Sequence, residues 1–120
     1  MTKTAFLFAG QGAQYLGMGR ELYDQYAIVK ETIDQASQVL GYDLRDLIDN
    51  DETKLNQTRY TQPAILATSV AIYRLLKEKG FQPDMVAGLS LGEYSALVAS
   101  GALDFEDAVA LVAKRGSYME

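Results

Sequence analysis

The chain has 120 residues, 48% of them hydrophobic, and a formal net charge of −5. This composition indicates a soluble globular domain with a core of its own, and the acidic balance argues against general binding of nucleic acid, whose phosphates it would repel. The sequence contains no cysteine, which excludes disulfides and cysteine-based metal sites, and it contains no histidine. No apolar run reaches the roughly 18 residues of a membrane span, and the apolar stretch 5–9 is too short for a secretory signal. We therefore expect a cytoplasmic protein without a membrane segment.

The first forty residues predict a strand, a loop and a helix. Residues 3–9 form a short apolar run that ends at a glycine, which is typical of a buried strand. Residues 10–19 contain four glycines and predict a loop whose backbone takes unusual dihedral angles or approaches another group closely. Apolar residues then recur at helical spacing from 29 to 40, and Gly41 predicts the end of that helix.

The middle of the chain predicts a surface connection followed by a buried helix. Residues 43–56 are polar and charged apart from a short apolar element of Leu44, Leu47 and Ile48, and we expect a partly helical connection on the surface. Thr61, Gln62 and Pro63 are predicted to open the next helix, with the proline in the first turn, where a missing N–H is tolerated. Residues 64–76 are apolar around most of the helix circumference, which places this helix at the centre of a larger protein.

The last forty residues predict a second strand and two helices. Residues 85–87 form a brief strand, residues 92–100 are compatible with a helix, and Asp104 begins a final helix with Asp107 in a variant of the capping box. The order of strand, helices, strand and helix predicts an α/β fold with a parallel sheet. Because two strands cannot cover so apolar a central helix, and no finishing element precedes Glu120, we interpret residues 1–120 as part of a longer protein.

One motif in the chain predicts a catalytic serine. Residues 88–92 read Gly-Leu-Ser-Leu-Gly, match the G-x-S-x-G pattern and lie between a predicted strand and a predicted helix. A backbone that turns sharply to expose Ser90 holds it in a strained conformation and leaves no room for side chains two residues on either side. The helix that follows directs its positive end toward Ser90. The alternative is that Ser90 is only the N-cap of a helix after a glycine-rich turn.

Three segments together resemble one enzyme family. Residues 88–97 read Gly-Leu-Ser-Leu-Gly-Glu-Tyr-Ser-Ala-Leu, residues 8–14 read Phe-Ala-Gly-Gln-Gly-Ala-Gln, and residues 61–64 read Thr-Gln-Pro-Ala. In this order they resemble malonyl-CoA:acyl carrier protein transacylases and the acyltransferase domains of fatty acid and polyketide synthases. The resemblance extends over essentially the whole chain. It implies the N-terminal part of an α/β-hydrolase-like core with a nucleophile elbow; the family's ferredoxin-like small subdomain lies outside residues 1–120.

The resemblance also implies a mechanism, which is ping-pong transfer of a malonyl group from malonyl-CoA to acyl carrier protein in fatty acid biosynthesis. Ser90 would carry the malonyl ester, and the backbone N–H groups of Gln11 and Leu91 would hold the oxyanion. Coenzyme A enters as part of the substrate, and no bound cofactor or metal is expected. The family usually has histidine where Leu89 stands, and we expect this difference to affect local packing or selectivity.

Helical spacing makes Arg115 a candidate functional residue independently of the resemblance. On the last predicted helix it lies within 60° of Ala108, Leu111 and Val112, in the middle of the apolar stripe. A guanidinium that faces inward needs an anionic partner, unless its stem packs and its head reaches water near the helix end. The resemblance implies that Arg115 binds the malonyl carboxylate in a bidentate pair, which favours a dicarboxylic acyl group.

Other interpretations of these residues remain open. The loop around Gln11 could be a plain turn or bind phosphate, but Tyr15 stands where a dinucleotide fingerprint needs its third glycine. Glu93 and Tyr94 are expected to be a first-turn acid and a packing residue. The chain has no histidine to serve as a base for Ser90, so residues 1–120 alone should be inactive. The whole protein could also be a serine esterase or thioesterase, or a non-catalytic module that docks a carrier protein.

Overall fold

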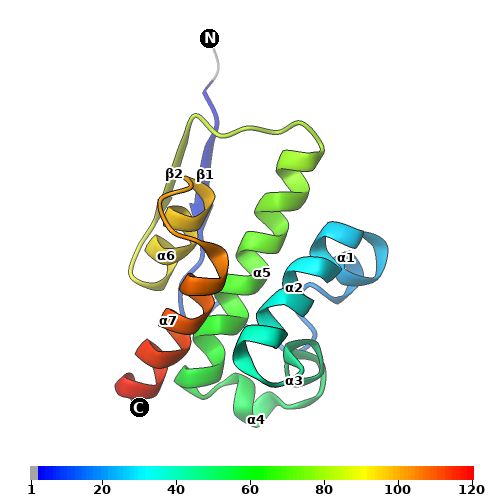
Figure 1. The fold of residues 1–120 in the computed structure, drawn as a ribbon, viewed down its shortest axis with the longest axis vertical. Coiled ribbons are helices and arrows are strands. Elements are labelled where there is room, and N and C mark those ends of the chain that lie inside the picture. Colours follow the sequence, from blue (N-terminus) through cyan, green and yellow to red (C-terminus); the bar gives the residue numbers. More distant parts are fainter. Residues whose placement is uncertain (1–2) are drawn as a thin grey trace.

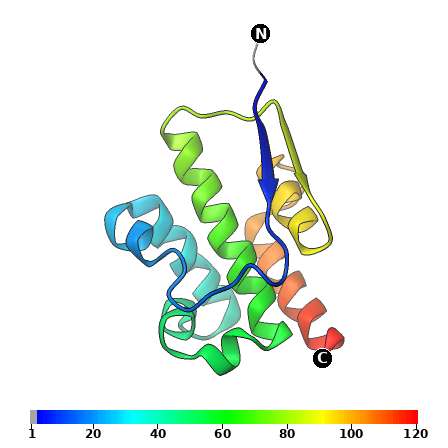
Figure 2. The same cartoon turned by 180° about the vertical axis from the view of Figure 1, so that it is seen from behind.

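The longest helix that the structure describes, α5 (Thr58–Glu78), separates two groups of elements (Figure 1). The computed structural model describes residues 3–120. On one side lie the sheet and the last two helices, and on the other side lie the helices that precede α5 (Figures 1 and 2). In chain order the remaining elements are β1 (Ala5–Phe8), α1 (Arg20–Gln25), α2 (Ala27–Leu40), α3 (Leu44–Asn50), α4 (Glu52–Leu55), β2 (Met85–Gly88), α6 (Leu91–Ala99) and α7 (Phe105–Met119).

The sheet of the described residues is parallel, as the sequence predicted. β1 pairs with β2 in a register that sets Phe6 opposite Val86 and Phe8 opposite Gly88. The rings of Phe6 and Phe8 face the ring of Tyr73 on α5, with centroids 6.0 and 6.1 Å apart. One face of the sheet therefore packs on the central helix, and the carboxyl ends of both strands point the same way.

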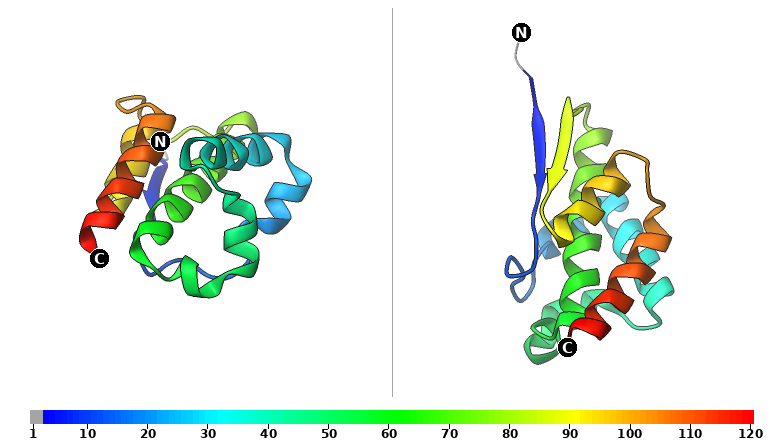
Figure 3. Two further views of the ribbon diagram at one scale, coloured as in Figure 1. Left: turned by 60° about the horizontal axis from the view of Figure 1, so that its bottom comes forward. Right: turned by 90° about the vertical axis from the view of Figure 1, so that its left-hand side faces the viewer.

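The prediction that residues 3–9 form a buried strand is wrong in its burial. β1 alternates between exposed and half-buried residues, and Leu7 is 82% exposed. The cause is visible in Figure 3, where the helices of residues 3–120 lie on one side of the two strands. A parallel strand becomes fully buried only when both faces of its sheet are covered.

The interpretation of residues 43–56 as a surface connection is also partly wrong. This stretch forms α3 and α4, and Leu44, Ile48 and Leu55 are almost completely buried in the core. Asp43 caps α3 by accepting a hydrogen bond of 3.0 Å from the backbone N–H of Asp46. Most polar residues that suggested a surface segment lie on the outer faces and caps of two short helices, whose inner faces contribute to the core. Arg45 is the exception: it is buried and donates to the carbonyl of Met18 and to the carboxylate of Asp49.

The central helix starts one turn earlier than predicted. α5 begins at Thr58, so Pro63 lies inside the helix and cannot donate to the carbonyl of Arg59. The turn before the proline is held by the hydroxyl of Thr61, which donates to the carbonyls of Leu55 and Gln57. Side-chain hydrogen bonds thus anchor a first turn that the sequence pattern alone did not show.

The end of α2 and the start of α7 follow the sequence signals, whereas the sequence did not predict α1. Gly41 ends α2 with φ 82°, and Gly80 follows the end of α5 with φ 93°. Both values lie in the left-handed region, where glycine is favoured. The carboxylate of Asp104 accepts a hydrogen bond of 3.2 Å from the N–H of Asp107 at the start of α7.

Candidate active site

The turn between β2 and α6 holds Ser90 in a strained backbone conformation. Ser90 has φ 56° and ψ −115°, and among residues 3–120 it is the only residue other than glycine with a positive φ. A residue with a Cβ adopts such angles at an energetic cost and keeps them only where the surroundings impose them. The strand, the turn and the helix therefore combine to set the direction of one serine hydroxyl.

The two glycines of the motif are required by close backbone contacts. A Cβ on Gly88 would lie 2.1 Å from the carbonyl oxygen of Gly92, and a Cβ on Gly92 would lie 2.4 Å from the carbonyl oxygen of Phe8. Both distances are far inside van der Waals contact, and the groups in the way are backbone atoms. The turn thus closes tightly on itself and against the end of β1.

Arg115 on α7 reaches Ser90. Its Nη2 donates to the serine Oγ at 3.1 Å, and its Nη1 donates to Oε1 of Gln62 on α5 at 3.0 Å. The centre of the guanidinium lies 5.5 Å from the ring centroid of Tyr94, within the range of a cation–π contact. The neighbouring Lys114 is exposed. Three elements therefore hold the charged group of Arg115 at the serine.

A close crossing of α5 and α7 explains how Arg115, on α7, comes within hydrogen-bond distance of Gln62 on α5. A Cβ on Gly116 would lie 2.6 Å from the carbonyl oxygen of Thr58, so the two helix backbones touch at this point. Beyond it, Glu120 accepts hydrogen bonds from the backbone N–H of Arg59 at 3.0 Å and from its Nε at 2.7 Å. The glycine next to Arg115 brings α7 against the first turn of α5.

The glycine-rich loop lies next to the Ser90 turn. A Cβ on Gly10 would be 3.5 Å from the carbonyl oxygen of Leu89, which is ordinary van der Waals contact. The Nε2 of Gln11 donates to Oγ1 of Thr58 at 3.2 Å, and the amide of Gln14 donates to Oδ1 of Asn56 at 3.0 Å. The loop is therefore tied by side chains to the residues that lead into α5.

Leu89 and Leu91 flank the serine in opposite environments. Leu89 is 83% exposed, whereas Leu91, the first residue of α6, is buried in the core. The first N–H groups of a helix have no acceptor within the helix and point outward from its end. The structure thus brings Ser90, Leu91 and Arg115 together, with the loop of Gln11 beside them.

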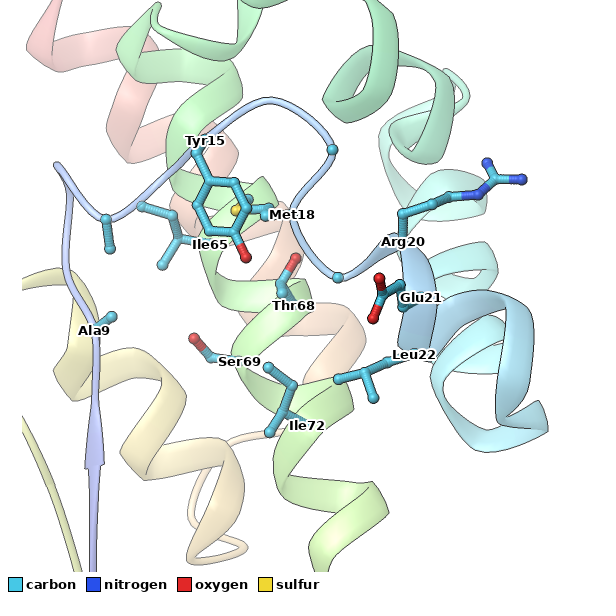
Figure 4. A pocket seen from close by; sticks show the side chains of 13 residues that line it. Ala9, Tyr15, Met18, Arg20, Glu21, Leu22, Ile65, Thr68, Ser69 and Ile72 are labelled. Atoms are coloured by element: carbon cyan, nitrogen blue, oxygen red, sulfur yellow. The ribbon is translucent and has the colours of Figure 1, made fainter.

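A cavity beside the glycine-rich loop does not include the Ser90 turn. It has a volume of about 700 Å³ and is lined by the loop, α1 and α5 (Figure 4). Tyr15, Thr68 and Ile72 lie around it, and its lining includes neither Ser90 nor Arg115.

Within residues 3–120 no helix is long and apolar enough to cross a membrane, and no cluster of side chains is suited to hold a metal ion.

Sequence reasoning missed two residues of this site. It used Gln62 only as part of a family segment and treated Tyr94 as packing. Gln62 precedes the buried Ile65 and Leu66 by three and four positions, which places it on the inner face of the helix. A polar residue on an inward face needs a partner, and that signal was available in the sequence.

The fold and the site define an α/β protein with a strained serine at a strand-to-helix turn and an arginine fixed beside it. The acyl transferase domain family matches residues 5–120, and the chain belongs to this family.

Individual relatives agree with this assignment. The chain is 52% identical over 120 residues to the malonyl CoA-acyl carrier protein transacylase of Bacillus subtilis, covering 99% of this chain and 38% of that protein. It matches the crystal structure of MCAT from Streptococcus pneumoniae with a TM-score of 0.97 and 91% identity, covering 98% of this chain and 39% of the other. It also matches a malonyl-transacylase in complex with its type II PKS acyl-carrier protein, with a TM-score of 0.94 and 50% identity, covering 98% and 39%. The chain spans about two fifths of the length of these relatives.

Proposed function

We propose that this chain carries the serine nucleophile of an enzyme that transfers a malonyl group from coenzyme A to the phosphopantetheine thiol of acyl carrier protein, in fatty acid biosynthesis. The observation that carries the proposal is the 3.1 Å contact between the guanidinium of Arg115 and Oγ of Ser90. An acyl group bound to this serine would have its far end within reach of a fixed cation. A cation there favours an acyl group that ends in a carboxylate. Relatives with this function support the choice of substrate and acceptor.

In the proposed mechanism the turn at Ser90 is a nucleophile elbow. The Oγ attacks the thioester carbonyl carbon, its proton passes to a base, and the tetrahedral intermediate collapses with release of the coenzyme A thiolate. The malonyl group then remains as an ester on Ser90 until the carrier thiolate attacks the same carbon and the serine oxygen leaves. The strained φ of 56° supports this role, because it is typical of a serine exposed at a strand-to-helix turn.

We propose that the backbone N–H groups of Gln11 and Leu91 stabilise the oxyanion. Leu91 begins α6, so its amide lies at the positive end of a helix. The loop of Gln11 lies beside the Ser90 turn at Gly10 and is held to α5 through Thr58. Fixed donors of this kind contribute about 3 kcal/mol each to transition-state stabilisation.

Arg115 is proposed to bind the malonyl carboxylate. A guanidinium carries five N–H donors, and the hydrogen bonds to Ser90 and Gln62 use two of them. A carboxylate can therefore form two parallel hydrogen bonds with Arg115 while Gln62 keeps its place. A terminal methyl group would gain neither the hydrogen bonds nor the charge, so malonyl is favoured over acetyl.

The proposed enzyme needs residues outside this chain. The sequence contains no histidine, so we propose that the base for Ser90, like the small ferredoxin-like subdomain, belongs to another part of the protein. Residues 1–120 would form the first part of the large hydrolase-like subdomain. The 120-residue chain alone is then expected to have negligible transferase activity.

The proposal is tested by following malonyl groups in the full-length protein. Incubation with radioactive malonyl-CoA should label Ser90, and added acyl carrier protein should remove the label as malonyl-carrier. Ser90→Ala should lower transfer by at least about a thousandfold without changing the melting temperature. Release of free malonate in place of malonyl-carrier would indicate a hydrolase instead. An unaltered rate in Ser90→Ala would contradict the catalytic role and favour a docking module.

A further inference from the structure

Gln62 is a buried polar residue at the crossing of α5 and α7. Its side chain is 0% exposed, although its amide carries both donors and an acceptor. Burial of an amide costs free energy unless its polar atoms are hydrogen-bonded. Here the Nε2 donates to Sδ of Met119 at 3.1 Å, and the Oε1 accepts from Nη1 of Arg115 at 3.0 Å.

The chemistry of Arg115 determines how the amide of Gln62 is oriented. A guanidinium has only donors, so the atom of Gln62 that faces it must be the oxygen. The thioether of Met119 is a weak acceptor and receives the remaining amide group. The main hydrogen bond of the buried amide is therefore directed at Arg115.

The acceptor at position 62 is uncharged, and this matters for the proposed substrate. A neutral amide oxygen holds the guanidinium in place and leaves its positive charge available for a carboxylate. An aspartate or glutamate here would form an ion pair with Arg115 and compete with any anionic ligand. The ring of Tyr94, 5.5 Å from the guanidinium carbon, is also uncharged. Both groups fix Arg115 without neutralising it.

We infer that Gln62 is a positioning residue that directs Arg115 toward the acyl group on Ser90, and that it thereby sets the preference for acyl groups ending in a carboxylate. The inference rests on the proposed function. It extends that function by assigning a role to a residue on α5 whose side chain forms hydrogen bonds with Arg115 and Met119.

The test compares malonyl-CoA and acetyl-CoA as substrates of full-length variants. Gln62→Leu keeps the side chain's approximate size but removes the acceptor, and Gln62→Glu keeps its shape but adds a competing charge. In both variants we expect the KM for malonyl-CoA to rise about tenfold, since hydrogen bonds to charged groups have this order of strength. The kcat/KM for acetyl-CoA should change less than about twofold. Gln38→Leu, the same change at an exposed glutamine of α2, is the matched control and should behave as the wild type.

A double-mutant cycle separates positioning from a purely structural role. In an Arg115→Ala background, Gln62→Leu should leave the remaining malonyl transfer unchanged, because its target is gone. Equal losses in both backgrounds, or equal losses for malonyl-CoA and acetyl-CoA, would overturn the inference. Should Gln62→Leu not fold, the isosteric Gln62→Glu decides alone: an unchanged KM for malonyl-CoA would mean that the residue only packs. Ser90→Ala tests the proposed function separately. The transfer activity of this variant depends on the nucleophile and not on the preference for malonyl-CoA over acetyl-CoA.

Discussion

The two sides of α5 differ in how their residues are stabilised. On the side of α2 to α4, Ile33, Leu44 and Ile48 are almost completely buried. On the side of the sheet, Leu7 and Leu89 are more than four fifths exposed, and Ser90 has a strained backbone. The first side resembles a conventional helical core, whereas the second holds the candidate site. Leu91, the residue after Ser90, is 1% exposed and belongs to the same core as Ile33 and Ile48, so the strained turn is anchored in that core.

The largest effect is expected where the turn is tightest. Gly88→Ala would place a Cβ 2.1 Å from the carbonyl oxygen of Gly92, and no flexible side chain can move away to make room. We expect a loss of about 3 kcal/mol or more in the free energy of unfolding, together with loss of malonyl transfer, measured by denaturant unfolding and by activity of the full-length protein.

Gly10→Ala is the matched control for this change. Its new Cβ would meet the carbonyl oxygen of Leu89 at 3.5 Å, an ordinary contact. We expect a change within about 0.5 kcal/mol. Equal destabilisation by the two substitutions would show that the tight contact at Gly88 does not limit the turn.

The next effect tests the buried core on the central helix. Leu66 on α5 is 0% exposed, so Leu66→Ala should leave a cavity and lower the free energy of unfolding by about 2–5 kcal/mol. Leu7→Ala removes a side chain that is 82% exposed, and in the 120-residue chain it should change stability by less than about 0.5 kcal/mol. Urea unfolding followed by circular dichroism measures both. Similar losses would mean that β1 is packed as firmly as the core on α5.

A smaller effect is expected at the cap of α3. The carboxylate of Asp43 accepts from the N–H of Asp46, and Asp43→Ala should lower the free energy of unfolding by about 1 kcal/mol. Asp43→Asn retains an oxygen acceptor and should recover most of this loss. If Asp43→Ala and Asp43→Asn lower the free energy of unfolding by the same amount, the negative charge of Asp43 stabilises the helix and the hydrogen bond does not.

The sequence predicted the periodic and glycine-marked parts of this fold better than its boundaries. The helix that ends at Gly41 followed from a local pattern, and the parallel pairing of the strands followed from the order of the elements. The start of α5 did not, because the hydroxyl of Thr61 anchors a turn ahead of Pro63 through carbonyls outside the pattern. Burial of β1 could not be read from its apolar run, since burial depends on which elements cover the sheet.

Local sequence patterns also predicted only part of the candidate site. Ser90 was found from its motif, and the inward face of Arg115 from helical spacing. The partner of Arg115 on α5 was not found, because Gln62 lies 53 residues away along the chain and the contact depends on two helices touching at Gly116. A crossing of this kind is a property of tertiary packing, and a helix pattern read from one segment does not contain it.

The smallest effect concerns an ion pair on the outer surface of the helical side. Asp34 accepts from Nζ of Lys30 at 2.9 Å and from the hydroxyl of Tyr23 at 2.7 Å. Partial burial is the largest influence and raises the pKa of Asp34, but the hydrogen bonds from Lys30 and Tyr23 and the charge of Lys30 outweigh it. The pKa therefore lies below its ordinary value of 3.8.

A carboxyl whose pKa is lowered by folding stabilises the folded state above its unfolded pKa, and this contribution disappears as the pH falls through the folded pKa. The side chain of Asp34 is 45% exposed, so water screens the pair and Asp34→Asn should cost only a few tenths of a kcal/mol at pH 7. The stability difference between wild type and variant should stay constant from pH 7 down to about pH 5 and shrink below 3.8. Glu31→Gln, at an exposed position of the same helix, is the control. A difference that grows as the pH falls would contradict the lowered pKa, because it would mean that folding favours the protonated carboxyl.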